Sequence, residues 1–406
     1  MKKPTNLSLA LCLLILGIAE SCKSKFDEKK YLTELLNNIE KVKSASYVIT
    51  ITLPVMGDET RFNTFKYYAK EFANPMDTAI GSSHGLFYLE DNAKLHSAYD
   101  GNAKIDAYHD DKRIAIDSFK VYSVPFRRTR SFFTSTKDVV KYALNSNDST
   151  LTEFYDFGDS LLFSLTIYSD KQVVLGYGKP AYFEMPYEPD EVISKYDIWI
   201  NNSTKLPYKY KITYPGSSSC EEINELQVNT MNINDFIPAR YIPADYDIVF
   251  RGEEQKPATA DLTGTKVPDW TLSDYNNESF ALKDFASKVL LLQFSGIGCP
   301  PCHASLPFLN QLVTNYKGKS FELVRIECWS NNVEAIKNYR LNNNIEYKFL
   351  ISDKEIEKKY NVLAVPTFFI LDDNRTIQKV IRGFPAETTA KEIREKEIRE
   401  AINKLL

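Results

Sequence analysis

The sequence is poor in several residue types, and each shortage excludes a class of protein. It has 15 glycines in 406 residues, below the average of about 7%, which excludes collagen-like chains and Gly-rich linkers. Four histidines are too few for a His-rich metal protein, and we expect no metal site. Lys and Arg number 50 against 54 Asp and Glu. The resulting net charge of −4 excludes an overall basic nucleic-acid-binding protein, so we expect no nucleic acid partner.

Long apolar runs are also scarce. The longest is residues 7–19, which follow Lys2 and Lys3. This run is too short to cross a bilayer as a helix but has the length of a signal-peptide core. The segment up to Cys22 resembles a bacterial lipoprotein signal, although Ala19 and Glu20 depart from the usual residues before the cysteine. The resemblance implies a signal peptide over residues 1–21, lipidation at Cys22 and a tether over residues 22–30.

The alternative is an ordinary secretory signal that is cut nearby. Either signal would place the mature chain in an oxidising compartment, where disulfide chemistry operates. We therefore expect a lipoprotein of the bacterial cell envelope that is anchored in the membrane and faces the periplasm or the cell surface.

Periodicity divides the rest of the chain into two blocks. Residues 27–44 have apolar side chains at helical spacing, and residues 136–144 fit a second helix. Alternating runs of β-branched and aromatic residues predict strands between and after these helices. The runs are 47–53, 65–72, 85–88, 113–121, 161–168, 171–177, 196–200 and 207–214. A leading helix before a long antiparallel sheet predicts an α+β domain over residues 31–251.

This first block resembles the half-open β-barrel of the bacterial lipoprotein-carrier superfamily. The resemblance rests on the opening amphipathic helix, the turn at residues 99–101, and residues 196–200 followed by Lys205-Leu206-Pro207. It implies a concave face that holds an acyl chain or a partner segment. The alternative is a spacer or docking domain without a ligand.

A linker precedes the second block. Residues 252–264 are poor in large apolar side chains, so we predict a boundary there and a second domain over residues 265–406. The continuous apolar run 288–294 is typical of a strand buried on both faces. Shortly after it stands the motif Cys299-Pro300-Pro301-Cys302, followed by a helical pattern.

The motif therefore lies at a strand-to-helix turn, with Cys299 at the start of the helix. Unpaired N–H groups and the helix dipole stabilise a thiolate at such a position. The second cysteine lies three residues on, within reach of the first, as a disulfide requires.

The surroundings of the motif follow the element order of the thioredoxin fold, with an α/β arrangement. Residues 266–406 are similar to the TlpA and ResA family of membrane-tethered thiol–disulfide oxidoreductases. The segments that carry the resemblance are the opening hairpin (267–272 and 280–285), the strand 321–327, the inserted helix and strand (332–341 and 347–351), Val365-Pro366-Thr367, and the final helix (388–406).

The resemblance implies a mechanism and partners. Cys299 is the attacking thiol and Cys302 the resolving one, and exchange passes through a mixed disulfide. Val365 and Pro366 form a cis peptide that faces the disulfide and offers the backbone of Val365 to a substrate segment. No cofactor is needed besides the redox-active disulfide. The implied partners are disulfide-containing exported proteins and a membrane thiol electron donor, and the favoured direction is reduction.

The chain departs from the family at two positions. Gly298 stands where a Trp commonly precedes the first cysteine, which removes an apolar wall. Gln293 stands where thioredoxin has a buried carboxylate, and an amide cannot act as a base. Two other groups are candidates for proton transfer, Glu327 and His303. For Glu327 the alternative is an exposed residue at the end of a strand.

Two other families share part of the motif. Cys299-x-x-Cys302-His303 is also the attachment motif of c-type haem, but every Met and the other His residues lie in the first block, away from a distal-ligand position. Peroxiredoxins place Pro seven residues and Thr or Ser three residues before their reactive cysteine. The chain has Leu292 and Gly296 there.

Two further cysteines, Cys220 and Cys328, lie beyond the predicted signal peptide and outside the motif. Cys328 ends a predicted strand and is either a small buried apolar residue or a third thiol near the site. Cys220 falls in a Ser-rich segment that predicts a loop, and is either free or paired with Cys328.

The sequence thus predicts an envelope-anchored thiol–disulfide oxidoreductase. The alternative function is a lipid- or client-binding lipoprotein whose thioredoxin module is a docking unit.

Overall fold

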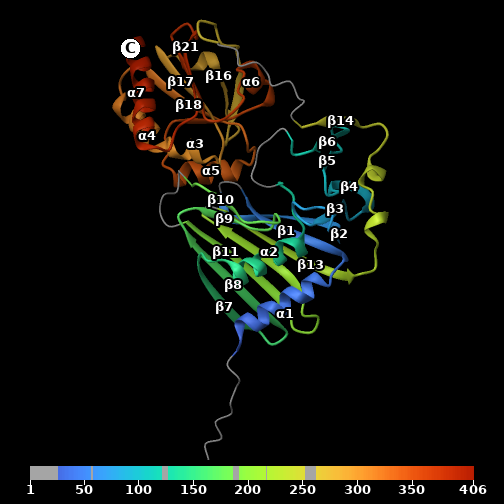
Figure 1. Cartoon of the computed structure of the whole chain (residues 1–406). Helices are drawn as coiled ribbons and strands as arrows, with labels where there is room; N and C mark the ends of the chain where they lie inside the picture. Colours follow the sequence, from blue (N-terminus) through green and yellow to red (C-terminus); the bar gives the residue numbers. More distant parts are fainter. Residues whose placement is uncertain (1–25, 56–57, 121–126, 186–191, 216, 252–261) are drawn as a thin grey trace, which may run out of the picture.

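The computed structural model describes residues 26–406 apart from 56–57, 121–126, 186–191, 216 and 252–261 (Figure 1). The predicted signal peptide, the lipidation site Cys22 and most of the predicted linker lie outside the described residues. Within them, the strands form a 12-stranded sheet, a two-stranded ribbon and a 7-stranded sheet. The same residues contain no helix long and apolar enough to cross a membrane.

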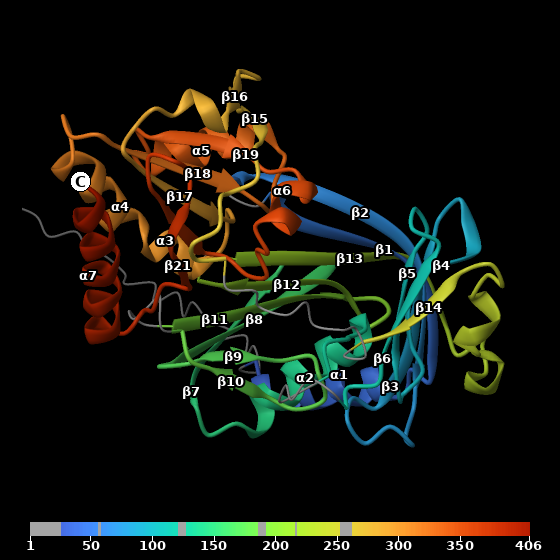
Figure 2. The ribbon, with the colours of Figure 1, turned by 90° about the horizontal axis from the view of Figure 1, so that it is seen from above.

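The first sheet runs in the order β14-β6-β5-β4-β3-β2-β1-β13-β12-β11-β8-β7. Its neighbouring strands are antiparallel except for β14 and β6, which are parallel. Seen from above in Figure 2, β3 to β6 and β14 lie at one end of this sheet and β7, β8 and β11 at the other. The strands are β1 (Ser44–Val55), β2 (Asp58–Ala73), β3 (Ser82–Tyr88), β4 (Asp91–Tyr99), β5 (Lys104–Tyr108), β6 (Arg113–Asp117), β7 (Ser149–Asp156), β8 (Ser160–Ser169), β11 (Val192–Asn201), β12 (Pro207–Tyr214), β13 (Ser217–Val228) and β14 (Asp247–Phe250), and the ribbon is β9 (Gln172–Val174) with β10 (Ala181–Phe183).

Two helices, α1 (Glu28–Glu40) and α2 (Phe132–Asn145), cover one face of this sheet (Figure 1). The side chain of Asp27 accepts the Lys30 N–H at 2.9 Å and so caps α1. Leu32, Leu35 and Ile39 of α1 are buried in one cluster with apolar residues of α2 and of β1, β8, β11 and β12. The half-open barrel with a ligand-holding face remains a prediction.

One local prediction in the first block is wrong. Cys220 does not lie in a loop: it is part of β13, where it pairs with Lys211 of β12 and Thr52 of β1. A strand that lies between two others needs no apolar signal of its own at its start, because both neighbours supply backbone partners. The second helix also begins four residues earlier than predicted, at Phe132.

The second sheet runs in the order β16-β15-β19-β18-β17-β20-β21. Its centre is parallel, since β17 pairs with β18 and β18 with β19 in that sense, whereas β20 is antiparallel to β17. The elements are β15 (Thr271–Asp274), β16 (Ser279–Ala281), β17 (Val289–Ser295), α3 (Pro300–Ala304), α4 (Leu306–Asn315), β18 (Phe321–Glu327), α5 (Val333–Asn342), β19 (Lys348–Ile351), α6 (Lys354–Lys359), β20 (Thr367–Leu371), β21 (Ile377–Arg382) and α7 (Thr388–Leu405).

Strand β17 is buried along its whole length, which agrees with its continuous apolar run. Val289 and Leu291 pack in one cluster with α4, α5 and α7, whereas Leu290, Leu292 and Phe294 pack in another with α6 and the opening hairpin. Helices therefore cover both faces of this sheet, as the thioredoxin fold requires. The end of β17 delivers the chain to α3, where the cysteine pair lies.

Candidate active site

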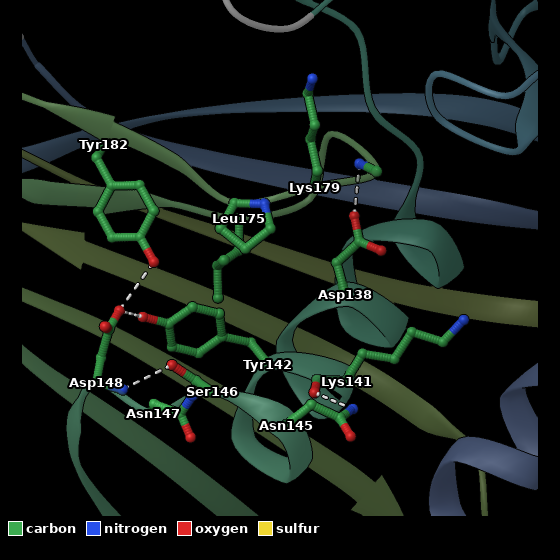
Figure 3. Close-up of a pocket in the computed structure, with 12 residues that line it drawn as sticks. Asp138, Lys141, Tyr142, Asn145, Ser146, Asn147, Asp148, Leu175, Lys179 and Tyr182 are labelled. Atoms are coloured by element: carbon green, nitrogen blue, oxygen red, sulfur yellow. Dashed lines mark hydrogen bonds between the residues drawn. The ribbon is translucent and has the colours of Figure 1, made fainter.

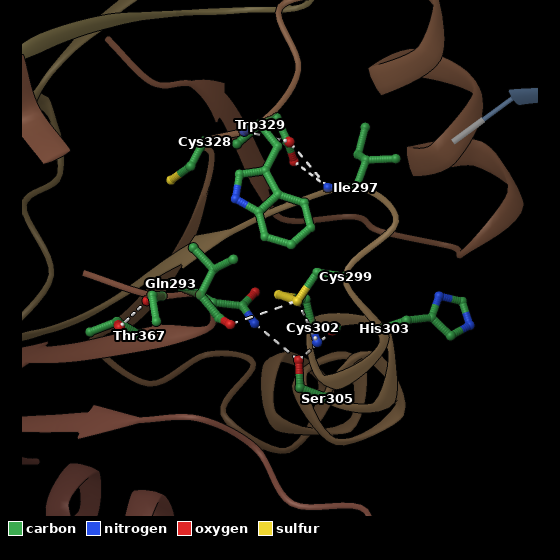
Figure 4. The surroundings of a disulfide bond; sticks show 12 residues. Gln293, Ile297, Cys299, Cys302, His303, Ser305, Cys328, Trp329 and Thr367 are labelled. Carbon is green, nitrogen blue, oxygen red and sulfur yellow. Dashed lines mark hydrogen bonds between the residues drawn. A yellow bond between two sulfur atoms is a disulfide. The ribbon is translucent and has the colours of Figure 1, made fainter. Parts of the chain in front are cut away.

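The cysteine pair lies shortly after the C-terminal end of β17, with Cys299 directly before α3 and Cys302 in its first turn (Figure 4). Cys299 and Cys302 form a disulfide with a Cα–Cα separation of 5.2 Å. Cys299 is the N-cap of α3, and its Sγ accepts the backbone N–H of Cys302 at 3.2 Å. Both side chains are almost fully buried. A thiolate at Cys299 would keep this hydrogen bond, which favours the charged form.

The Val365–Pro366 peptide lies against the disulfide. Its bond is cis, and the carbonyl oxygen of Val365 lies 3.8 Å from Sγ of Cys299. The next residue, Thr367, begins β20, which is hydrogen-bonded to β17. The structure therefore brings together the two segments that the sequence placed at the site, although 62 residues and more separate them in the chain.

A chain of buried polar groups lies beneath the pair. The amide of Gln293 donates to Oγ of Ser305 at 2.9 Å, and Ser305 donates to the carbonyl of Cys302 at 2.7 Å. Arg325, which is fully buried, donates to the amide oxygen of Gln293 at 3.2 Å. Its guanidinium also lies against the rings of Tyr339 and Phe349. Gln293 thus connects the first turn of the active-site helix to a buried cation.

Glu327 is buried, so the exposed alternative is wrong. Its carboxylate accepts the backbone N–H groups of Ile297 at 3.0 Å, Trp329 at 3.1 Å and Ser330 at 3.0 Å. Burial raises the pKa of this carboxyl, against the opposing effect of these N–H groups and of Arg325. Glu327 ties the loop before Cys299 to the turn that follows β18.

His303 is exposed, and in Figure 4 its ring points away from the two sulfurs. Its Nδ1 lies 3.4 Å from the hydroxyl of Tyr339 on α5. Among the two candidates for proton transfer, the structure brings Glu327 to the loop of the redox pair and leaves His303 on the outer side of the helix.

The other two described cysteines are free thiols, and no bond joins them. Cys328 is buried in the apolar cluster below the opening hairpin, and burial raises its pKa to about 12. These properties fit a small apolar residue rather than a reactive thiol. Cys220 is half-buried on β13, and burial raises its pKa as well.

The hydrophobic periodicity of the sequence does not identify one residue of the site, Trp329. Trp329 follows β18, is 54% exposed, and lies over Gly296 beside the redox pair (Figure 4). A tryptophan directly after a buried strand, next to polar residues, is the only sequence feature that could have drawn attention to it.

Comparisons with known proteins agree with this geometry. The model of the AhpC/TSA family matches residues 263–380. The thiol-disulfide oxidoreductase ResA of Bacillus thuringiensis subsp. konkukian (strain 97-27) is 31% identical over 134 residues, which are 32% of this chain and 75% of that protein. ResA of Bacillus subtilis (strain 168) is 24% identical over 144 residues, 35% of this chain and 77% of that protein.

A crystal structure of a thiol:disulfide interchange protein DsbE from Chlorobium tepidum has 28% sequence identity and a TM-score of 0.31, covering 34% of this chain and 97% of that one. The segment matched to ResA, 134 residues in length, is similar in length to the thioredoxin-like part of the structure. The chain therefore belongs to the ResA-like family of thiol–disulfide oxidoreductases.

Proposed function

We propose that this oxidoreductase acts on disulfides of exported proteins through Cys299 and Cys302, in the direction of reduction. The observation that carries the proposal is the placement of the disulfide at the start of α3, with Sγ of Cys299 3.8 Å from the Val365 carbonyl. A redox pair that lies beside free backbone groups can act on an extended protein segment.

The reaction starts from the reduced pair. The Cys299 thiolate attacks one sulfur of the client disulfide, forms an S–S bond with it, and releases the other client sulfur as a thiolate that takes up a proton. Cys302 then loses its proton and attacks Sγ of Cys299, which releases the second client thiol. Two electrons pass to the client, and the Cys299–Cys302 disulfide seen in the structure is the product. A membrane dithiol restores the reduced pair by the reverse exchange.

Glu327 is the better candidate for accepting the proton of Cys302. Burial raises the pKa of its carboxyl above the ordinary value of a glutamate, which strengthens it as a proton acceptor. Its carboxylate binds the loop of Ile297 in the oxidised state, so transfer to it needs a bridging water or a small shift of that loop. In Figure 4 the ring of His303 points away from the two sulfurs, so His303 is the poorer candidate for this role.

The anchoring proposal comes from the N-terminal sequence. Lipidation at Cys22 would hold the enzyme in the bacterial envelope, facing the periplasm or the cell surface, where exported proteins and a membrane electron donor are both within reach. The residues concerned precede the described part of the chain.

The structure offers less support for the alternative, a lipid- or client-binding lipoprotein. The face of the first sheet that would hold an acyl chain is packed by α1 and α2. A cavity of about 440 Å³ lies beside α2 and β10 (Figure 3). Its lining is polar at one end, where the hydroxyls of Tyr142 and Tyr182 both donate to the carboxylate of Asp148.

Cysteine variants test the proposal directly. Cys299→Ser should abolish reduction of protein disulfides, and Cys302→Ser should accumulate mixed disulfides with clients, because the resolving thiol is missing. Cys220→Ser is the matched control and should keep full activity, since this thiol lies in the first sheet. Full activity of Cys299→Ser would overturn the mechanism.

A further inference from the structure

Trp329 lies directly on the loop that leads to the redox pair. A Cβ atom on Gly296 would meet the indole of Trp329 at 2.4 Å, far inside contact distance, so only glycine leaves room for the ring. The indole therefore packs on the backbone of Gly296, three residues before Cys299. In Figure 4 the ring lies on the side of the loop that faces Cys299.

The other side of the ring is open. Trp329 is 54% exposed, whereas Trp270 is 7% exposed in the apolar cluster behind the sheet. Trp199 lies on the first sheet, with the ammonium of Lys209 over its ring. Exposing a large apolar ring to water has a cost that a partner surface removes. The indole thus offers an apolar surface next to a reactive disulfide.

Hydrogen bonds to Glu327 fix the backbone that carries the Trp329 ring. The buried carboxylate of Glu327 binds the N–H groups of Trp329 and Ser330 on one side and of Ile297 on the other. One group therefore holds both the turn that carries the indole and the loop on which the indole rests. A pre-positioned ring loses little freedom when a partner binds.

Sγ of Cys299 is flanked on another side by the carbonyl of Val365. An extended client segment that pairs with the backbone of Val365 would pass the sulfur with its own cysteine facing Cys299. Successive side chains of such a segment point in opposite directions, so the side chain two residues from the client cysteine faces the same way as the cysteine and can reach the indole. Gly298, which precedes Cys299, adds no side chain that would block this approach.

We propose that Trp329 is a specificity-determining residue, which binds an aliphatic or aromatic side chain close to the client cysteine. The proposal rests on the proposed function, because it concerns the clients of the same redox pair. Trp329 lies in the turn after β18. It provides the apolar surface that a Trp directly before Cys299 would have provided.

The experiment compares two peptides with the full chain in its reduced form. Each peptide carries one cysteine in a mixed disulfide with glutathione. The residues two positions before and after the cysteine are Leu and Phe in the first peptide and Ser in the second. Rate constants are measured for the wild type, Trp329→Ala, Trp329→Phe and the matched control Trp199→Ala. Oxidised glutathione serves as a client without flanking side chains, and the reduction potential of each variant is determined in parallel.

We expect the wild type to prefer the apolar peptide by about tenfold, the usual discrimination from one apolar group in a contact. Trp329→Ala should lose this preference, Trp329→Phe should keep most of it, and Trp199→Ala should keep all of it. In Trp329→Ala the rate with the apolar peptide should fall several times more than the rate with oxidised glutathione, whereas a merely structural role of the ring would lower both rates equally.

Two results would overturn the inference while the proposed function stands. One is an unchanged preference in Trp329→Ala. The other is an equal loss of rate with both peptides and with oxidised glutathione, which would show that the indole only supports the loop. A wild type that reduces none of the three disulfides would instead refute the proposed function.

Discussion

Two buried glutamates, one on a strand of each large sheet, accept the same kind of hydrogen bonds but have different roles. Glu71 on β2 accepts the N–H groups of Phe133 at 3.1 Å and Thr134 at 3.0 Å, in the first turn of α2. It also accepts hydrogen bonds from the hydroxyls of Tyr47 and Ser131. Glu327 accepts N–H groups from the two loops beside the redox pair. The first carboxylate fixes a helix on a sheet, and the second arranges groups around a reaction.

The arginines of the two regions differ in a similar way. In the first region Arg130 lies 2.7 Å from Glu221, and Arg127 lies 3.3 Å from Asp77. In the second region Arg325 forms no ion pair within the described residues, and its Nε has no hydrogen-bond partner there. Buried charges are normally paired, because desolvation is costly. The comparison teaches that the first region pairs these arginines with carboxylates, whereas the second holds a buried arginine under its redox pair through the amide oxygen of Gln293 and two aromatic rings.

Removing Glu71 should give the largest effect on stability. In Glu71→Ala the hydroxyl of Tyr47, the hydroxyl of Ser131 and the first N–H groups of α2 lose their acceptor in a buried place. We expect the first region to lose about 3 kcal/mol, in the range for breaking a buried hydrogen-bonded network. Urea unfolding followed by hydrogen exchange of β1 and β2 amides measures this loss.

A surface glutamate is the matched control for that variant. Glu40 forms an exposed ion pair with Lys141 at 2.9 Å, and Glu40→Ala should cost under about 1 kcal/mol. A shift of the Cys299–Cys302 reduction potential in Glu71→Ala would contradict this comparison, because Glu71 would then influence the redox reaction as well.

Glu327→Gln should change how stability depends on pH. Because burial raises the pKa of Glu327 in the folded chain, the native state binds more protons than the unfolded state between the ordinary glutamate pKa, about 4.3, and the raised value. The contribution of this group is therefore fully present below that window and is lost as the pH rises through the raised pKa. The variant has no such titration.

Urea unfolding at several values between pH 4 and 7, followed by hydrogen exchange of β17 and β18 amides, tests this expectation. The stability of Glu327→Gln relative to the wild type should rise with pH. A constant difference across this range would mean that Glu327 does not titrate there in the folded chain.

The alkylation rates of the two free cysteines should give the smallest of the expected effects, but one that separates the two regions clearly. Cys220 is half-buried, whereas Cys328 is buried and its pKa is raised to about 12. At pH 8 iodoacetamide should alkylate Cys220 at least about tenfold faster than Cys328, because the thiolate is the reactive form. Mass spectrometry of the oxidised chain measures both rates. Rapid alkylation of Cys328 would revive its assignment as a third thiol near the site.

The parts of the site that could be predicted are those with a strong local signal. The run before the motif has no polar interruption until Gln293, so β17 was evident as a doubly buried strand, and the prolines between the cysteines mark the start of a helix. Val365-Pro366 was placed opposite the cysteines by family resemblance, and the structure shows its carbonyl beside Cys299.

The missing parts depend on contacts between distant segments. The start of β13 is rich in Ser and gains its partners from β1 and β12, so no pattern in its own residues predicts a strand. The burial of Glu327 depends on the turn that closes over it, and the role of Trp329 depends on Gly296 in another loop. The contacts of Glu327 and Trp329 arise only when the parallel strands β17 and β18 bring their C-terminal ends to one edge of the sheet.

The most direct test of the central claim is a redox equilibrium of Cys299 and Cys302 in the purified protein. The chain is equilibrated with thiol buffers of graded potential, and the alkylated cysteines are counted by mass. The account predicts one reversible two-electron couple at this pair, with a potential near that of thioredoxin, about −270 mV. A pair that shows no reversible couple would contradict the assignment of the reaction to Cys299 and Cys302, and a potential far above this value would contradict the direction of reduction.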